Sequence, residues 1–467
     1  MEYISEPERM AGISQEPWGL ARNEIEQAAE TGRDVAALRV RLERLGPFDE
    51  DDLSKLHQEA LSAASPTDWP HFEESGLEDI LAALPSPFTG ATAPGRLEDR
   101  VHGAWAGRII GNMVGKPVEI GPTRTTIRDY LRSVDAYPLT DYVPFEDGAD
   151  RTGLGQLLPE EMILGATRGR VQGSVRDDDI DYTILGLHLL ETYGESFTTR
   201  DVAYEWLTRF PAYQVFTAER ATYQNLVREI PLERVGEFNN PYREWIGALI
   251  RADIYGYVAA GDPRRAAILS YRDAILSHRA NGVYGEMWAA ALVSSAFSSA
   301  SPEESVVTSL QSVPPTSRLA AELRTVLDDF RAGLTWEQAV DGIDARWPRM
   351  SWVHTINNAG ALAAAILWGC GDFVSTVGLS VQAGLDTDSV GATAGSWAGA
   401  YLGLSALPAH LVDPLEDTCR SGVFGFGESS ITAYAERTLK LIAATAGGEN
   451  HGACRRRSRR GRRHSGK

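Results

Sequence analysis

The chain has 467 residues, with 45 basic (Lys and Arg) and 64 acidic (Asp and Glu) side chains, a formal net charge of −19 and a pI near 5.0. Hydrophobic residues make up 43% and charged residues 23%. This is ordinary globular composition, and it excludes disorder, a collagen-like repeat or a disulfide scaffold as a description of the whole chain. At about 150 residues per domain, the length allows about three domains, or one large domain with extensions.

Cysteine use and hydropathy narrow the class of protein further. Cys370, Cys419 and Cys454 lie far apart and form neither a zinc-ligand pattern nor a disulfide framework. The acidic N-terminus is not typical of a secretory signal. The longest uncharged apolar stretch, 359–370, is shorter than the about 20 residues of a membrane span. We therefore expect a soluble, cytoplasmic protein without a membrane partner.

The first 84 residues have the pattern of charged, amphipathic helices. Apolar residues recur at helical spacing in 21–29, 35–45 and 51–64. The following segment, 85–96, holds three prolines and two glycines, which indicates a boundary. We expect residues 1–96 to form a helical N-terminal extension and linker.

Helix formers dominate from residue 97 to residue 447, with interruptions by Gly, Pro or Asn and without alternating strand and helix patterns. Ser301 before Pro302 is typical of a helix start. The predicted fold is all-α, with residues 97–447 as one domain.

Two predicted helices carry a glycine on every fourth residue. A glycine within a helix costs up to about 1 kcal/mol relative to alanine, and close approach of another backbone is a common compensation. The sequence leaves open whether the two glycine faces pack against each other or against bulky side chains elsewhere. The faces are Gly103, Gly107, Gly111 and Gly115, and Gly391, Gly395, Gly399 and Gly403.

An acidic cluster precedes an apolar run that is typical of a buried helix. Four aspartates lie within positions 177–181, and like charges at this spacing repel each other. One aspartate would be enough to cap the helix. We therefore interpret Asp177, Asp178 and Asp179 as ligands of a cation.

A second acidic motif, with Asp386, Asp388 and Ser389, precedes the second glycine-striped helix. Both motifs offer oxygen and neither offers His or Cys, which favours Mg²⁺, Mn²⁺ or Ca²⁺ over zinc. Glu119 is a third candidate, because Pro117 ends the first glycine-striped helix just before it.

In combination these segments resemble the ADP-ribosylglycohydrolase family, which includes the dinitrogenase-reductase-activating glycohydrolase. The helix GAWAGRIIGNMVGKPVE (103–119), the acidic motif and GLDTDS (384–389) follow the family order, and the likeness covers about residues 97–447. It implies an all-α catalytic domain with two divalent cations, Mg²⁺ or Mn²⁺, in a central cleft. It also implies hydrolysis of an N- or O-glycosidic bond in an ADP-ribosylated protein or a ribosyl small molecule.

The resemblance also assigns site residues. The metal ligands it implies are Asp177, Asp178, Asp179, Asp386, Asp388 and Ser389, with Asp177 where the family usually has Thr. The catalytic residues it implies are Glu119, Asp178 and Asp388. Segment 281–287 resembles the glycine-containing substrate loop of the family, with Asn281, Gly282 and Tyr284 as substrate-binding residues, although an ordinary turn is an alternative. Two further departures from the family pattern are Ile180 for Thr and Asn112 for Asp.

Two other functions are compatible with parts of the sequence. Residues 177–181 also fit the DDxxD motif of enzymes that handle prenyl diphosphates, but the second metal motif of those enzymes is missing. A catalytically silent protein that binds ADP-ribose on the same fold is the other alternative. The Arg-rich end, which we expect to be disordered over 448–467, could contact nucleic acid or an acidic surface, but it has no aromatic residue for base stacking.

Overall fold

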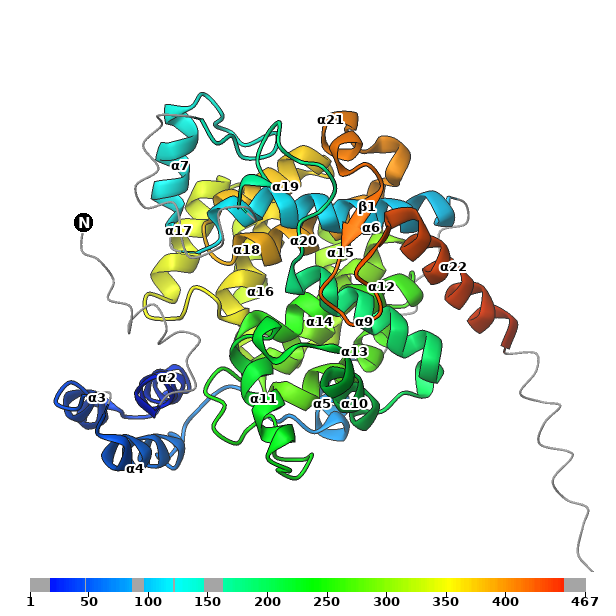
Figure 1. Cartoon of the computed structure of the whole chain (residues 1–467). Coiled ribbons are helices and arrows are strands. Elements are labelled where there is room, and N and C mark those ends of the chain that lie inside the picture. Colours follow the sequence, from blue (N-terminus) through cyan, green and yellow to red (C-terminus); the bar gives the residue numbers. More distant parts are fainter. Residues whose placement is uncertain (1–16, 47, 86–95, 121, 147–162, 449–467) are drawn as a thin grey trace, which may run out of the picture.

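The computed structural model describes residues 17–46, 48–85, 96–120, 122–146 and 163–448. These residues are mostly helical, and the strands among them form one two-stranded sheet, so the all-α prediction is confirmed (Figure 1). Among them, no helix is both long and apolar enough to cross a membrane. The tail predicted over 448–467 lies, but for its first residue, outside the described residues.

The N-terminal region contains short helices at the three predicted segments. Helices α2, α3 and α4 pack around a small apolar cluster of their own and lie beside the main body (Figure 1). In contrast, Ile80 of the next helix, α5, belongs to the main core. The bounds are α2 Pro17–Glu30, α3 Ala36–Leu42, α4 Glu50–Leu61 and α5 Leu77–Ala83.

The main body contains the remaining helices and the short antiparallel sheet. Its helices up to residue 296 are α6 Leu97–Gly115, α7 Arg124–Ser133, α9 Asp178–Tyr193, α10 Thr199–Arg209, α11 Thr217–Val227, α12 Asp253–Val258, α13 Pro263–Ser277 and α14 Asn281–Ala296. The later elements are α15 Pro302–Ser309, α16 Arg318–Arg331, α17 Trp336–Arg346, α18 Thr355–Gly369, α19 Phe373–Gln382, α20 Thr387–Leu402, α21 Ala409–Val412, β1 Thr418–Arg420, β2 Glu428–Ser430 and α22 Ile431–Gly448. Helix α15 begins as predicted, because Ser301 Oγ accepts a hydrogen bond from Glu304 N–H.

The two glycine-striped helices, α6 and α20, pack against each other through their glycine faces. A Cβ at Gly103 would lie 2.5 Å from the Gly399 carbonyl oxygen, and a Cβ at Gly391 would lie 2.5 Å from that of Gly111. The pairs run in opposite directions along the two helices, which are therefore antiparallel. Of the two arrangements that the sequence left open, the structure therefore shows the one in which the glycine faces pack against each other.

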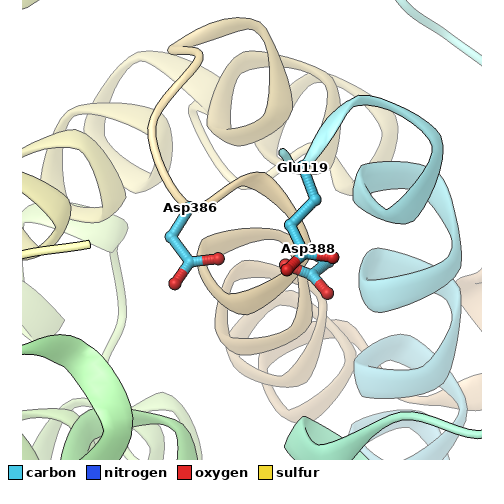
Figure 2. A group of neighbouring side chains, drawn as sticks. All are labelled: Glu119, Asp386 and Asp388. Carbon is cyan, nitrogen blue, oxygen red and sulfur yellow. The ribbon is translucent and has the colours of Figure 1, made fainter. Parts of the chain in front are cut away.

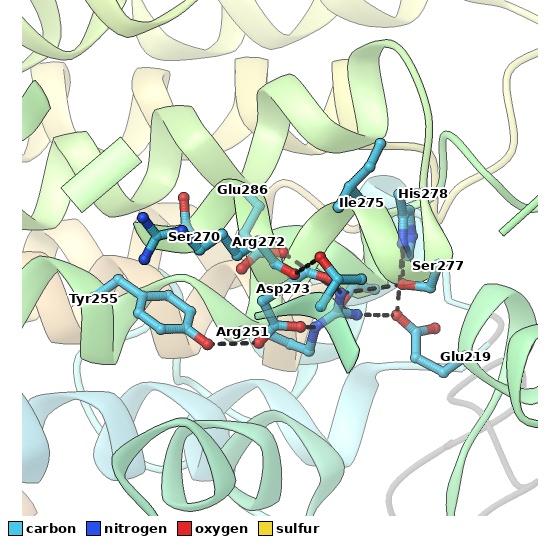
Figure 3. Close-up of polar contacts among 12 residues, drawn as sticks. Glu219, Arg251, Tyr255, Ser270, Arg272, Asp273, Ile275, Ser277, His278 and Glu286 are labelled. Atoms are coloured by element: carbon cyan, nitrogen blue, oxygen red, sulfur yellow. Dashed lines mark hydrogen bonds and ion pairs between the residues drawn. The ribbon is translucent and has the colours of Figure 1, made fainter. Parts of the chain in front are cut away.

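A buried cluster around Arg251 joins several other helices (Figure 3). The Arg251 guanidinium donates hydrogen bonds to Asp273 (2.9 Å) and Glu219 (2.5 Å), and it lies over the rings of Tyr182 and Trp206. These partners belong to α13, α11, α9 and α10. The Arg251 cluster thus connects α9, which begins with the first acidic motif, to α10, α11 and α13.

Candidate metal centre

The register of α6 against α20 brings the end of one helix to the start of the other. Gly115, the last residue of α6, packs against the backbone of Thr387 and Asp388. Thr387 Oγ1 also donates to the Gly115 carbonyl oxygen at 2.9 Å. Because the helices are antiparallel, residues 116–119 lie beside residues 386–388, although these segments are far apart in the chain.

Two polar residues of α6, Arg108 and Asn112, follow Gly107 and Gly111 and hold the start of α9 at the same place. Arg108 donates to the Asp179 carbonyl oxygen (2.8 Å), and Asn112 Nδ2 donates to Asp177 Oδ1 (3.0 Å) and Asp179 Oδ2 (2.9 Å). Ser389 Oγ of α20 donates to Asp179 Oδ1 at 3.2 Å. The two acidic motifs therefore meet in one site.

The carboxylates form two groups that share Asp388. Oxygen atoms of Glu119, Asp386 and Asp388 lie within 4.8 Å of one another, as do oxygen atoms of Asp177, Asp179 and Asp388. Figure 2 shows the first group, with Asp386 just before α20 and Glu119 on the chain leaving α6. Opposite ligands of Mg²⁺ or Mn²⁺ are about 4.2 Å apart, twice an oxygen–metal distance of about 2.1 Å. By the distances between carboxylates alone, small side-chain adjustments would let each group contact an ion.

Lys116 lies between the two groups and is a site residue that the sequence analysis did not identify. Its Nζ donates to Glu119 Oε2 (2.7 Å) and Asp388 Oδ2 (2.9 Å), and it forms an ion pair with Asp177 Oδ2. The lysine side chain is 4% exposed. Its position four residues after Asn112 and three before Glu119 was the available sequence signal, because those spacings share a helix face.

Asp178 and Asp181 lie differently from the other aspartates of the first motif. Asp178 is partly exposed and belongs to neither carboxylate group. Asp181 points to another segment, where it accepts hydrogen bonds from Ser421 Oγ (2.7 Å) and Gly422 N–H (2.9 Å) and pairs with Arg176. The last aspartate of the DDxxD pattern thus faces away from the carboxylate groups, which argues against a prenyl-diphosphate site.

Asn358 is a second residue that the sequence analysis missed. Its Oδ1 accepts the Asp386 N–H at 3.0 Å, while its Nδ2 donates to the Trp352 and His354 carbonyl oxygens at 2.7 and 2.8 Å. The loop before α18 thereby fixes the backbone that carries Asp386. Adjacent asparagines have many roles, so the sequence held no specific signal.

The site has more negative charge than its own cationic groups balance. Burial and repulsion between neighbouring carboxylates raise the pKa values of Glu119, Asp179 and Asp386 well above their usual range, and raise that of Asp178 to about 7. Burial alone would also raise the pKa of Asp177, but Lys116 lowers it. Charged carboxylates at this density therefore call for a further cation.

A hard divalent cation fits one side of this site. The Asp386 carboxylate groups with those of Asp388 and Glu119 (Figure 2), whereas Asp177, the partner of Lys116, belongs to the other group. On the other side, between Asp177, Asp388 and Glu119, the ammonium group of Lys116 already occupies the space. A divalent ion 4 Å from that ammonium would be repelled by about 8 kcal/mol at an effective dielectric constant of about 20.

The three predicted substrate-binding residues lie at the start of α14 and not among the carboxylates of the candidate metal centre. Asn281, Gly282 and Tyr284 are fully or almost fully buried in the first turns of α14, so the prediction of a loop here is wrong. Tyr284 donates its hydroxyl to the Glu74 carbonyl oxygen, and Asn281 Nδ2 donates to Glu244 at 2.8 Å. Residues 73–75 would have to move before substrate could touch this segment. A substrate role for it stays a prediction.

Comparison with known proteins identifies the family of this chain. A sequence model of the ADP-ribosylglycohydrolase family matches residues 93–448, about three quarters of the chain. The chain belongs to the ADP-ribosylglycohydrolase family. A solved structure titled "ADP-ribosylglycohydrolase-related protein complex" is similar at 19% sequence identity and a TM-score of 0.45, covering 74% of this chain and 99% of that one. The comparison with curated proteins finds no match.

Proposed function

We propose that this chain is a divalent-metal-dependent hydrolase that cleaves the glycosidic bond of an ADP-ribosyl or related ribosyl substrate. The observation that carries the proposal is the meeting of Glu119, the 177–179 motif and the 386–389 motif in one site. Membership of the family supports the glycohydrolase reaction. The substrate would be an ADP-ribosylated protein or a ribosyl small molecule.

We propose different roles for the residues of this site. Asp386 and Asp388 would hold the ion, Mg²⁺ or Mn²⁺, with Asp179 and Ser389 beside them. Such an ion, when bound, lowers the pKa of a coordinated water and stabilises charge on the sugar. Asp177 forms an ion pair with Lys116 and accepts a hydrogen bond from Asn112, so it would have a structural role and would not contact the substrate.

Glu119 and Asp178 are the carboxylates with access to solvent and would face the substrate. Asp178 would accept hydrogen bonds from ribose hydroxyl groups. Glu119 would orient a water molecule and accept its proton as the water oxygen bonds to the anomeric carbon. The bond from that carbon to the leaving nitrogen or oxygen breaks, and the leaving group takes up a proton.

The organisation of the chain follows from the same proposal. Residues 97–447 would be the catalytic domain, and residues 1–96 an extension that supports it through α5 and the 73–75 contacts. Residues 448–467 would be a disordered Arg-rich tail. We propose a cytoplasmic location for the protein.

The direct test is hydrolysis of a panel of ADP-ribosylated peptides and ADP-ribosyl nucleotides with Mg²⁺ or Mn²⁺, with and without a chelator. We expect release of ADP-ribose or ribose that the chelator abolishes. Tight binding of ADP-ribose, seen as a thermal shift, without hydrolysis of any substrate would instead support the silent binding protein.

Two variants test whether the reaction takes place at this site. Asp388→Asn should lose the ion and reduce kcat/KM by at least about 100-fold, which corresponds to about 3 kcal/mol of transition-state stabilisation. Glu119→Gln should keep the ion and lose kcat. Asp52→Asn is the matched control, because its carboxylate is 63% exposed on α4 and pairs with Lys55. Full turnover by Glu119→Gln would remove this residue from the reaction.

A further inference from the structure

The ammonium group of Lys116 is surrounded by carboxylates, as a bound metal ion would be. An ammonium group carries three N–H donors. Three carboxylates surround this one: Glu119 Oε2 at 2.7 Å, Asp388 Oδ2 at 2.9 Å and Asp177 Oδ2 in an ion pair. Every donor therefore has an anionic partner, and the partners belong to both carboxylate groups.

The backbone that carries Lys116 is held in place by close packing. Gly115, just before it, is pressed against the backbone of Thr387 and Asp388, and Pro117 follows it in a 3-10 turn, Lys116–Val118. With 4% of the side chain exposed, a displaced ammonium would remain buried without these partners. Burial of an unpaired charge is strongly unfavourable.

We propose that Lys116 acts as a built-in cation in place of one of the two divalent ions, so that the centre binds a single divalent ion on the side of Asp386 and Asp388. An ion that joined Asp388 Oδ2 to Glu119 Oε2 or Asp177 Oδ2 would need the space that Lys116 Nζ occupies. Among the residues that the structure describes, Lys116 pairs with Glu119, Asp177 and Asp388 and not with Asp386, and the Asp386 carboxylate lies within reach of an ion held by Asp388 (Figure 2). The inference rests on the metal site of the proposed function and replaces the expectation of two ions.

The test is the number of Mn²⁺ ions bound by the full-length protein, measured by equilibrium dialysis with elemental analysis and by electron paramagnetic resonance. We expect one Mn²⁺ per chain, with the resolved hyperfine spectrum of an isolated ion. Two ions per chain with an exchange-coupled spectrum would overturn the inference, and so would the absence of any bound ion.

Substitution of the lysine sharpens the test. Lys116→Met removes the charge and keeps much of the volume, so this variant should bind a second Mn²⁺ and show spin coupling. Lys116→Arg keeps the charge and should still bind one ion, and Asp386→Asn should lose the ion that the wild type binds. If Lys116→Met folds, as judged by its circular dichroism, and still binds one ion, the inference is wrong. If it does not fold, the wild-type count decides.

These readouts separate this inference from the proposed function. One bound ion without hydrolysis of any ribosyl substrate would retain the role of Lys116 and reject the hydrolase. Chelator-sensitive hydrolysis with two bound ions would retain the hydrolase and reject the role of Lys116.

Discussion

Single side chains with hydrogen bonds to more than one segment determine the geometry of the candidate metal centre. Asn112 joins α6 to the first acidic motif, and Asn358 joins the start of α18 to the backbone of Asp386. Asn112 orients two carboxylates and Asn358 orients the Asp386 backbone, and neither amide adds charge to the site. Groups that hold metal ligands in place commonly change metal affinity by 10- to 100-fold when they are removed.

Asn358→Ala should therefore weaken Mn²⁺ binding by about 10- to 100-fold, because the Asp386 N–H loses its acceptor and the loop before α18 loses two hydrogen bonds. Isothermal titration calorimetry with Mn²⁺ measures the change. Asn357→Ala is the neighbouring control, since the Asn357 side chain contacts Ser351 and Asn358 and not Asp386. Equal affinity in the wild type and Asn358→Ala would contradict a positioning role.

At the scale of elements, the α6–α20 pair determines where the site forms. The glycine faces let the two backbones approach until the carbonyl oxygens of one helix lie against the glycine Cα atoms of the other. This approach, in antiparallel register, places Glu119 beside Asp386 and Asp388. A methyl group at the contact would have to separate the helices and so would disturb both the packing and the carboxylate cluster.

Gly111→Ala should lower the free energy of unfolding by about 3 kcal/mol or more, since its Cβ would overlap the Gly391 carbonyl group and backbone cannot move aside as a flexible side chain can. Gly342→Ala in α17 is the matched control. The nearest atom to its Cβ is the end of the Arg346 side chain, at 3.0 Å, so the helix propensity of alanine should stabilise this variant by up to about 1 kcal/mol. Guanidinium chloride denaturation compares the two. Similar effects at both positions would show that close packing does not limit Gly111.

Across the whole molecule, the N-terminal helices are attached to the main body through buried charges. Arg243 pairs with Glu24 of α2, and Gln27 of α2 donates to Glu244 at 2.6 Å. Arg318 contacts both Glu244 and Glu73, so one arginine of α16 joins the main body to the chain before α5. Breaking one partner of a buried pair leaves an uncompensated charge, which makes these contacts sensitive to substitution and to pH.

Glu244→Gln tests this attachment. Burial alone would raise the pKa of Glu244, but Arg318 and the hydrogen bond from Asn281 lower it to about 2, below the value of about 4.5 in an unfolded chain. A carboxyl group whose pKa is lower in the folded state stabilises the fold above pH 4.5, and the contribution is lost as the pH falls towards 2. The variant should therefore be less stable than the wild type by on the order of 3 kcal/mol at pH 7, and the difference should shrink below pH 4.5.

Urea denaturation of the wild type and Glu244→Gln at a series of pH values measures this difference. Glu59→Gln is the control, because Glu59 also pairs with an arginine, Arg41, but both side chains are about half exposed. Its effect should be small at every pH. A difference between the wild type and Glu244→Gln that did not change with pH would show that the Glu244 charge makes no contribution.

The amino-acid sequence by itself determined the helical class, the two glycine-striped helices, the acidic motifs and the family, because each of these depends on residues close together in the chain. Only the tertiary structure decided that the glycine faces meet, that Lys116 lies among the carboxylates and that Asp181 turns away from them. It also placed Asn281 and Tyr284 under residues 73–75. These features depend on which surfaces pack together in space, and helix spacing fixes the face on which a side chain lies but not the partner that the face will meet.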